Sequence, residues 1–226
     1  ATVKAAESIN LYCDYGNADA GTGGAITING TLDAFEINMY GNADNDVVTF
    51  DVDYPDNYIT GAVMVFGGAG NDLVTVNRLH PLVTTHNGVR DTVTLDGQEG
   101  SDTYVVKLSG SGDYRINVFD SGLDAGYDEL RTYGTAAADE LLLRASADAE
   151  SVAFVAALHP ANEVERINYT QKLEHLLLDT GDSDDRVALD DNWTATTVRG
   201  GLGNDWFQVG QMFKTERDTN AGIATG

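Results

Sequence analysis

A short block that ends in aspartate recurs along this chain, and each copy is followed by a run of alternating apolar residues. The copies are GNADND at 41–46, GGAGND at 67–72, GQEGSD at 97–102, GTAAAD at 134–139, TGDSDD at 180–185 and GGLGND at 200–205. The intervals between them run from 20 to 46 residues. Repetition on this scale is typical of solenoids, in which each repeat stacks on its neighbour.

The runs on either side of the blocks predict β-strands. FEINM, AVMVF and HLLLD precede blocks, whereas VVTFDV, LVTVN and TYVVKL follow them. Their period of two is the mark of a half-buried strand, and their β-branched and aromatic residues favour the same structure. Strand, Gly-Asp corner, strand and longer return together predict an all-β fold. We expect a right-handed parallel β-helix, a β-roll-like solenoid with irregular coils.

No linker divides the chain, so we expect one elongated domain over 1–213. Residues 214–226 are predicted to be a polar tail or the start of a further unit, and we expect the sequence to be a piece of a larger protein. A looser copy of the block, SGLDAGYD, occupies 121–128. Two returns, 75–89 and 144–169, are too long for tight corners, and the second is expected to hold an extra coil or a short helix.

The charge of the chain is concentrated in aspartate. There are 36 acidic and 13 basic residues, a net charge of −23, and 26 of the acids are Asp against 10 Glu. Together with 25 Gly, this places short carboxylates beside turning backbone. Such a charge disfavours nucleic acids and acidic membranes as partners, and no apolar run is long enough to insert into a membrane. Bound cations are expected to neutralise part of it, with calcium as the first candidate.

Two copies carry a resemblance to a known family. GGAGNDLVT at 67–75 and GGLGNDWFQ at 200–208 fit the pattern G-G-x-G-x-D-x-U-x, in which U is a large apolar residue. They resemble the RTX repeats of exported bacterial adhesins and toxins, which are calcium-binding β-helix repeats. Calcium takes six to eight oxygen ligands, and glycine corners expose backbone carbonyls beside one carboxylate per turn.

The resemblance implies that Asp72 and Asp205 are ligands, with carbonyls from Gly67 to Gly70 and from Gly200 to Gly203 nearby. Corresponding or neighbouring carboxylates in degraded copies extend the candidate set to Asp44, Asp46, Asp102, Asp128 and Asp185. Asp139 is expected to be structural. Asp182 and Asp184, together with Asp185, form a second candidate cluster, because three acids within four residues repel one another without a cation.

The chain departs from the RTX pattern in its spacing. RTX repeats follow one another every nine residues and face each other in pairs, whereas the corners here are about 25 residues apart. A plain turn is the alternative interpretation, since Asn and Asp tolerate left-handed backbone and bond their own main chain. It does not explain why Asp so often stands immediately before a strand.

These observations predict a calcium-stabilised structural or adhesive segment of a larger secreted or cell-surface bacterial protein. Calcium outside the cell would bridge the corners and allow the coils to stack. The expected partners are calcium ions, and also a cell-surface glycan or neighbouring units of the same protein.

The alternative is a glycan-binding or polysaccharide-modifying module, similar to a lyase or an epimerase. A catalytic groove could be lined by Asp51, Asp53, Tyr54, Asp56, Tyr58 and Arg90. A stacking platform for sugars could use Trp193, Trp206, Tyr104, Tyr114 and Tyr127.

Sequence motifs give no support for an enzyme. No zinc-protease, serine-hydrolase or phosphate-loop motif is present, and His80 and His159, each followed by Pro, are expected to be turn residues. The lone Cys13 excludes an intramolecular disulfide. We therefore expect a chain without catalytic activity.

Overall fold

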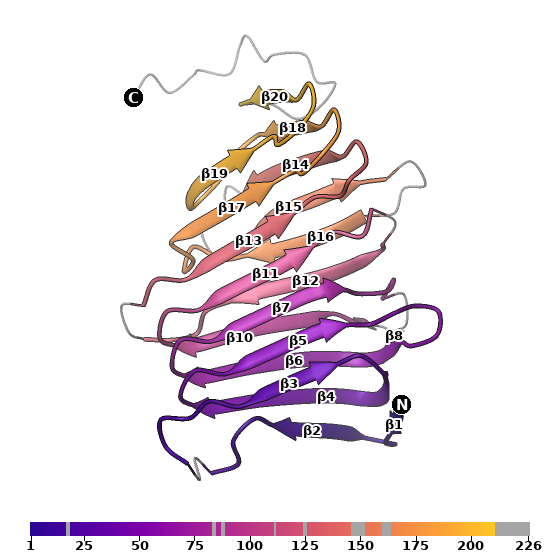
Figure 1. Ribbon diagram of the computed structural model, residues 1–226, viewed down its shortest axis with the longest axis vertical. Coiled ribbons are helices and arrows are strands. Elements are labelled where there is room, and N and C mark those ends of the chain that lie inside the picture. Colours follow the sequence, from indigo (N-terminus) through magenta and orange to yellow (C-terminus); the bar gives the residue numbers. More distant parts are fainter. Residues whose placement is uncertain are drawn as a thin grey trace.

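Two largely parallel β-sheets make up the protein (Figure 1). The computed structural model describes residues 1–16, 19–82, 85–86, 89–110, 112–123, 126–145, 152–159 and 164–210. Within these ranges every regular element is a strand, which confirms the all-β prediction. No helix long and apolar enough to cross a membrane occurs in them. The predicted tail at 214–226 lies outside the described residues.

Along the chain, most consecutive strands alternate between the two sheets. The larger sheet has the order β1 (Thr2–Lys4), β4 (Thr31–Ala43), β6 (Ile59–Ala69), β10 (Val93–Glu99), β12 (Tyr114–Phe119), β16 (Val164–Tyr169), β15 (Ala153–Leu158), β14 (Glu140–Ala145), β18 (Arg186–Leu189) and β20 (Trp206–Val209), and β2 (Ser8–Tyr12) also pairs with β4. The smaller sheet has the order β19 (Ala195–Arg199), β17 (His175–Asp179), β13 (Glu129–Tyr133), β11 (Thr103–Lys107), β7 (Leu73–Arg78), β5 (Val47–Asp51) and β3 (Ala25–Ile28). A separate antiparallel pair is formed by β8 (Thr85–His86) and β9 (Val89–Arg90).

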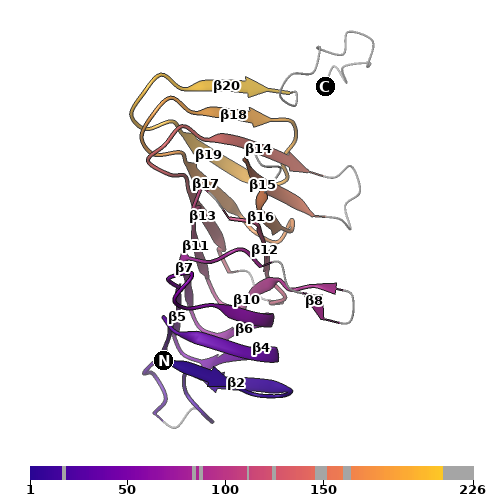
Figure 2. The same cartoon turned by 90° about the vertical axis from the view of Figure 1, so that its right-hand side faces the viewer.

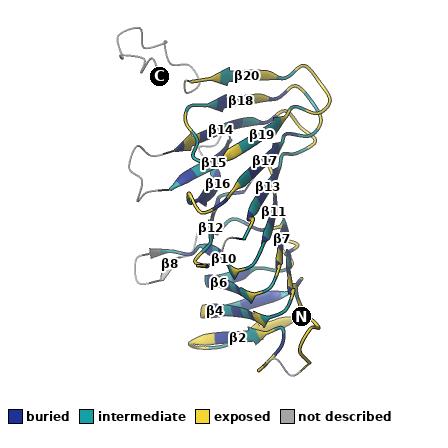
Figure 3. Cartoon of the chain, turned by 90° about the vertical axis from the view of Figure 1, so that its left-hand side faces the viewer, coloured by how far each residue is buried: buried dark blue, intermediate teal, exposed yellow. Residues whose placement is uncertain are grey.

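Apolar residues that occupy equivalent positions in successive strands form the core between the sheets. In the larger sheet Ile37, Val63, Val93, Ile116 and Ile167 lie side by side in register, and none is more than 1% exposed. The alternate residues of the same strands face outward, as period two requires. Figure 3 shows the buried positions recurring along the strands of both sheets. Most strands of both sheets therefore contribute to one continuous core.

The expectation of a short helix or an extra coil in 144–169 is wrong for its described residues. There β14, β15 and β16 pair antiparallel and widen the larger sheet between β12 and β18 (Figure 2). The run AFVAAL of β15 is apolar without alternation, and Ala156 and Ala157 are 3% and 1% exposed. A short apolar run covered on both faces has no period, so its sequence does not distinguish a strand from a helix.

The Gly-Asp corners lie on two opposite edges. The blocks at 41–46, 67–72 and 97–102 lead from the larger sheet to the smaller one, on the left in Figure 1. The blocks at 134–139, 180–185 and 200–205 lead from the smaller sheet to the larger one, at the upper right. The corners therefore form two separate stacks, which the sequence pattern did not predict.

Candidate metal centre

Most of the corners share one backbone conformation. In five of them the second and fourth residues have positive φ, the left-handed region. These residues are Asn42 and Asp44, Gly68 and Gly70, Gln98 and Gly100, Gly181 and Ser183, and Gly201 and Gly203. Glycine adopts this conformation without strain, and Asn and Asp tolerate it better than other residues. The alternating glycines of the block thus follow from the path of the turn.

On the first edge, the carboxylates link each corner to the one before it. The backbone N–H of Asp46 donates to Asp72 Oδ1 at 2.7 Å, that of Asp72 to Asp102 Oδ1 at 2.8 Å, and that of Asp102 to Asp128 Oδ1 at 2.7 Å. The Asp128 N–H then donates to Glu174 Oε2 at 2.7 Å. Four predicted ligands are therefore brought into one row, which we call the first carboxylate ladder.

The second edge repeats the arrangement with three corners. The Asp139 N–H donates to Asp185 Oδ1 at 2.8 Å, and the Asp185 N–H donates to Asp205 Oδ1 at 3.1 Å. The carbonyl of Asp185 also accepts from the Trp206 N–H at 2.8 Å. Each corner is tied to its neighbour through a side chain as well as through the main chain. This row is the second carboxylate ladder.

The other carboxylate oxygen, Oδ2, is buried in Asp46, Asp72, Asp102 and Asp185. Asp72 and Asp185 are 3% and 1% exposed, and among the described residues their Oδ2 atoms have no hydrogen-bond partner. A buried carboxylate oxygen without a donor costs free energy, which a proton or a cation could recover. These two oxygens are the observation in the structure that best fits a bound cation.

Glycine stands five residues before the aspartate because the carboxylate lies against it. A methyl group added to Gly67 would lie 2.2 Å from Asp72 Oδ2 and 2.6 Å from the carbonyl oxygen of Gly97. At Gly41 the corresponding distances are 2.6 Å to Asp46 Oδ2 and 2.0 Å to the carbonyl oxygen of Gly67. A carboxylate oxygen and a carbonyl oxygen of the next corner therefore face the same glycine. Both are oxygen ligands of the kind that calcium uses.

Burial also changes the acidity of the ladder. It raises the pKa of the Asp72 carboxyl to about 6, and the nearby Asp46 carboxylate contributes to the rise. It raises the pKa of Asp128 to about 7, with Asp120, Asp102 and Glu174 adding repulsion. The ladder thus holds stacked carboxyls that bind a proton far more readily than free aspartate does.

The remaining predicted ligands do not face into the ladders. Asp44 Oδ2 accepts a hydrogen bond from the Gly21 N–H at 2.8 Å. Asp182 and Asp184 are exposed, and Asp184 Oδ1 accepts from the Asn204 N–H at 2.8 Å. Only Asp185 of that predicted cluster is buried. Within the described ranges, no three His, Cys, Asp or Glu side chains lie close enough together to hold a metal, so a cation would need carbonyl oxygens as well.

Asp139 differs from the other corner residues. Its Oδ2 accepts a hydrogen bond from the Thr135 N–H at 2.7 Å within the same turn. Burial raises its pKa, as it does for Asp46. The bond to Thr135 agrees with the structural role expected for this residue.

In the structure, the charged residues of the predicted catalytic groove belong to two separate sets of ion pairs. Arg78 bonds Asp51 at 2.5 Å and Asp53 at 2.8 Å, whereas Arg90 bonds Asp113 at 2.7 Å. The predicted sugar platform is wrong for two of its members, because Tyr104 and Tyr114 are fully buried. Their rings fill the core, where the alternation of the strands places them.

Both proline-linked histidines are buried more than a surface turn requires. His80 is 7% exposed, and its Nε2 accepts a hydrogen bond from the Ile59 N–H at 2.6 Å. Burial lowers the pKa of its imidazole. His80 therefore holds the return segment before β10 against β6.

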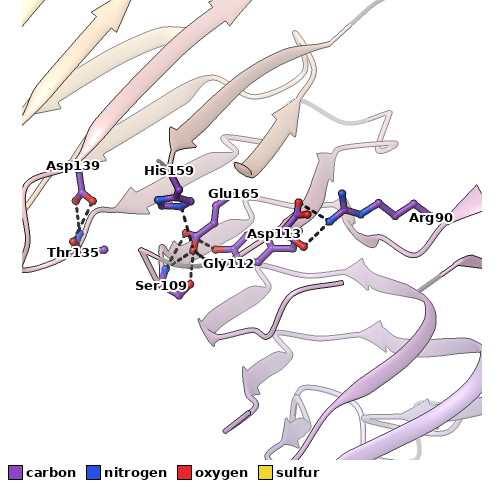
Figure 4. A network of polar contacts seen from close by, with 9 residues as sticks. Arg90, Ser109, Gly112, Asp113, Thr135, Asp139, His159 and Glu165 are labelled. Carbon is purple, nitrogen blue, oxygen red and sulfur yellow. Dashed lines mark hydrogen bonds and ion pairs between the residues drawn. The ribbon is translucent and has the colours of Figure 1, made fainter. Parts of the chain in front are cut away.

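A buried glutamate, which no sequence motif marks, anchors the return segment between β11 and β12 (Figure 4). Glu165 is 0% exposed and accepts hydrogen bonds from the Ser109 N–H at 2.9 Å, the Gly112 N–H at 2.6 Å and the Tyr114 hydroxyl at 3.2 Å. The Nε2 atom of His159 lies 3.7 Å from its Oε1. A single Glu outside any block gives no signal in the sequence, since its partners come from distant segments.

Comparisons with known proteins assign no family to the chain. Neither the protein-family models, nor the curated proteins, nor the solved structures contain a match. The interpretation of the site therefore depends on its geometry.

Replacing Gly67 with Ala tests the close approach of the carboxylate. We expect a loss of about 2–4 kcal/mol in the free energy of unfolding, because the new methyl group collides with Asp72 Oδ2 and a neighbouring carbonyl. Gly16→Ala is the control, since Gly16 has a φ of +77° but nothing within 4 Å. It should cost about 1 kcal/mol from backbone strain alone. Urea denaturation measures both, and equal losses would contradict the proposed contact.

The raised pKa values predict how stability depends on pH in the presence of a chelator. Asp72 and Asp128 titrate near 6 and 7 in the folded protein but near about 3.9 when unfolded. The folded state then binds more protons between pH 4 and 7, so stability falls as the pH rises through this range. Melting temperatures should therefore increase from pH 8 to pH 5. Asp72→Asn should flatten this dependence more than Asp56→Asn, an exposed control; equal flattening would contradict the assignment.

Proposed function

We propose that this chain is a structural segment, a right-handed parallel β-helix similar to RTX proteins, in which calcium neutralises the corner carboxylates. The handedness follows the general rule for parallel crossovers, and the alternation of strands between two sheets supports the solenoid. The calcium proposal rests on two buried Oδ2 atoms, that of Asp72 in the first ladder and that of Asp185 in the second. Neither has a hydrogen-bond partner within the described residues.

The ligand chemistry favours calcium over softer metals. The oxygens that face the corner glycines are carboxylate and backbone carbonyl, as at Gly67 and Gly41. Calcium prefers hard oxygen ligands and accepts irregular geometry, whereas zinc prefers Cys and His. Asp46, Asp72, Asp102 and Asp128 would hold ions on the first edge, and Asp185 and Asp205 on the second.

Neutralisation by calcium explains how a chain with a large negative charge can stack its acidic corners. The chain has a net charge of −23, and each ladder places like charges one coil apart. Without a cation these carboxylates repel one another and must bind protons to remain buried. Calcium at extracellular concentration would supply that charge and couple binding to folding. The segment would thus belong to a secreted or cell-surface protein, where it acts as a spacer or an adhesive unit.

Thermal unfolding in chelator, in millimolar calcium and in millimolar magnesium tests the proposal. Calcium at about one hundred times its Kd should raise the melting temperature by roughly 5–10 °C, and magnesium should do much less. Asp72→Asn and Asp185→Asn should each reduce the calcium shift, because each removes the charge but keeps an oxygen that can accept the ladder hydrogen bond.

Asp56→Asn is the matched control, because Asp56 is exposed and lies outside both ladders. It loses the same charge and should keep the full calcium shift. A wild-type protein without any calcium shift would contradict the proposal. So would the same shift in wild type and both ladder variants.

A further inference from the structure

Three arginines meet on the surface of this otherwise acidic chain. Arg90, Arg115 and Arg166 line one pocket of about 260 Å³ together with Asp113 and Val164. The pocket thus holds three cationic side chains and one carboxylate, a local charge of 3 − 1 = +2. The net charge of the whole chain is −23, so general solubility does not explain this cluster.

Two of the arginines oppose each other directly. Arg115 on β12 and Arg166 on β16 are register partners; Arg115 is exposed and Arg166 is half-buried, each beside buried neighbours in its own strand. Like charges at directly opposite positions of neighbouring strands destabilise a sheet. Burial lowers the pKa of the Arg166 guanidinium, and the charge of Arg115 lowers it further. The fold therefore keeps a repulsive pair that a single substitution would remove.

The hydrogen bonds of the pocket leave this pair without a counter-charge. Arg90 donates to the Leu82 carbonyl at 2.6 Å and to Asp113 Oδ1 at 2.7 Å, so Asp113 is already paired (Figure 4). Arg166 bonds neutral Asn168 at 2.6 Å, and its guanidinium lies 4.0 Å from the centre of the Phe154 ring.

Arg115 itself has no hydrogen bond or ion pair in the portion of the chain that the structure describes. Arginines elsewhere on the chain do have carboxylate partners. Arg78 pairs with Asp51 and Asp53, Arg131 with Glu129 and Arg144 with Asp190. Arg115 thus differs from these three arginines in having no carboxylate partner among the described residues.

We propose that Arg115 and Arg166 form a binding site for a small oxyanion, a carboxylate or sulfate group. Two guanidinium groups side by side present planar forks of N–H donors, which match the oxygens of such an anion in bidentate geometry. The anion would relieve the repulsion between them. The small pocket and the negative charge of the chain favour a compact ligand with one or two charges over an extended polyanion.

Nuclear magnetic resonance of the arginine Nε–H groups tests the site. Wild-type protein is titrated with sodium acetate and, separately, with sodium sulfate, while sodium chloride keeps the ionic strength constant. The Nε–H signals of Arg115 and Arg166 should shift and saturate with at least one of the two anions. Saturation with acetate alone identifies a carboxylate site, with sulfate alone a tetrahedral-anion site, and with both a site for either group.

Arg115→Gln should raise the half-saturating concentration about tenfold through the loss of charge-assisted hydrogen bonds. Arg186→Gln is the control, because Arg186 is exposed on β18 of the same sheet and its register partners are Glu140 and Trp206. In chloride alone, Arg115→Gln should also melt at a higher temperature than wild type.

Two results would overturn the proposal. One is a shift that grows linearly with both anions, which indicates weak general salt effects only. The other is a half-saturating concentration that is the same in wild type and Arg115→Gln. Because the titrations contain no calcium, either result leaves the proposed role of the ladders unaffected.

Discussion

The buried corner carboxylate is the constraint on which the rest of this structure depends. Its Oδ1 accepts the main-chain N–H of the preceding corner, so the turn at one corner is completed by a side chain of the next corner. An isolated turn would leave that N–H to water, whereas in the stack it is buried and must be paired. The carboxylate supplies an acceptor of the right length at the position where the chain enters a strand.

Several features of the sequence follow from this interaction. Gly67 stands five residues before Asp72 because the carboxylate occupies the space that a β-carbon would need. Within the ladders the carboxylate is Asp at every corner but one, because the shorter side chain reaches the neighbouring N–H from the same turn. Glu174 takes the place of Asp only where the first ladder crosses to β17, after the antiparallel insertion. The same device accumulates negative charge along two edges, which links the stability of the fold to protons and, in our proposal, to calcium.

The strands and corners could be predicted from the sequence because each depends on neighbouring residues. Alternation marked strands such as Leu73–Arg78, and the repeated block located every well-formed corner. Features that depend on distant residues could not be predicted. The inward orientation of Asp72 becomes visible only when Gly67 and Asp102 are placed beside it. The division of the corners between two edges follows from the strands between them, because β11, β12 and β13 separate the block at 97–102 from the block at 134–139.

The same distinction applies to the smaller sites. Glu165 bonds Ser109 and Gly112 over more than fifty residues of sequence, and Arg115 meets Arg166 only through the register of β12 and β16. No local sequence pattern indicates either contact. In a chain with irregular repeats, the corners can therefore be predicted from the sequence. The contacts made by the return segments cannot.

Native-state hydrogen exchange of the corner amides tests the central claim most directly. The N–H groups of Asp46, Asp72 and Asp102 lie in turns, yet each donates to a buried carboxylate. The ladder predicts that they exchange only when the whole protein unfolds, at the rate of amides in the central strands β6 and β10. Exchange as fast as that of Tyr54 and Asp56, in an exposed turn, would contradict the ladder as the interaction that holds neighbouring corners together.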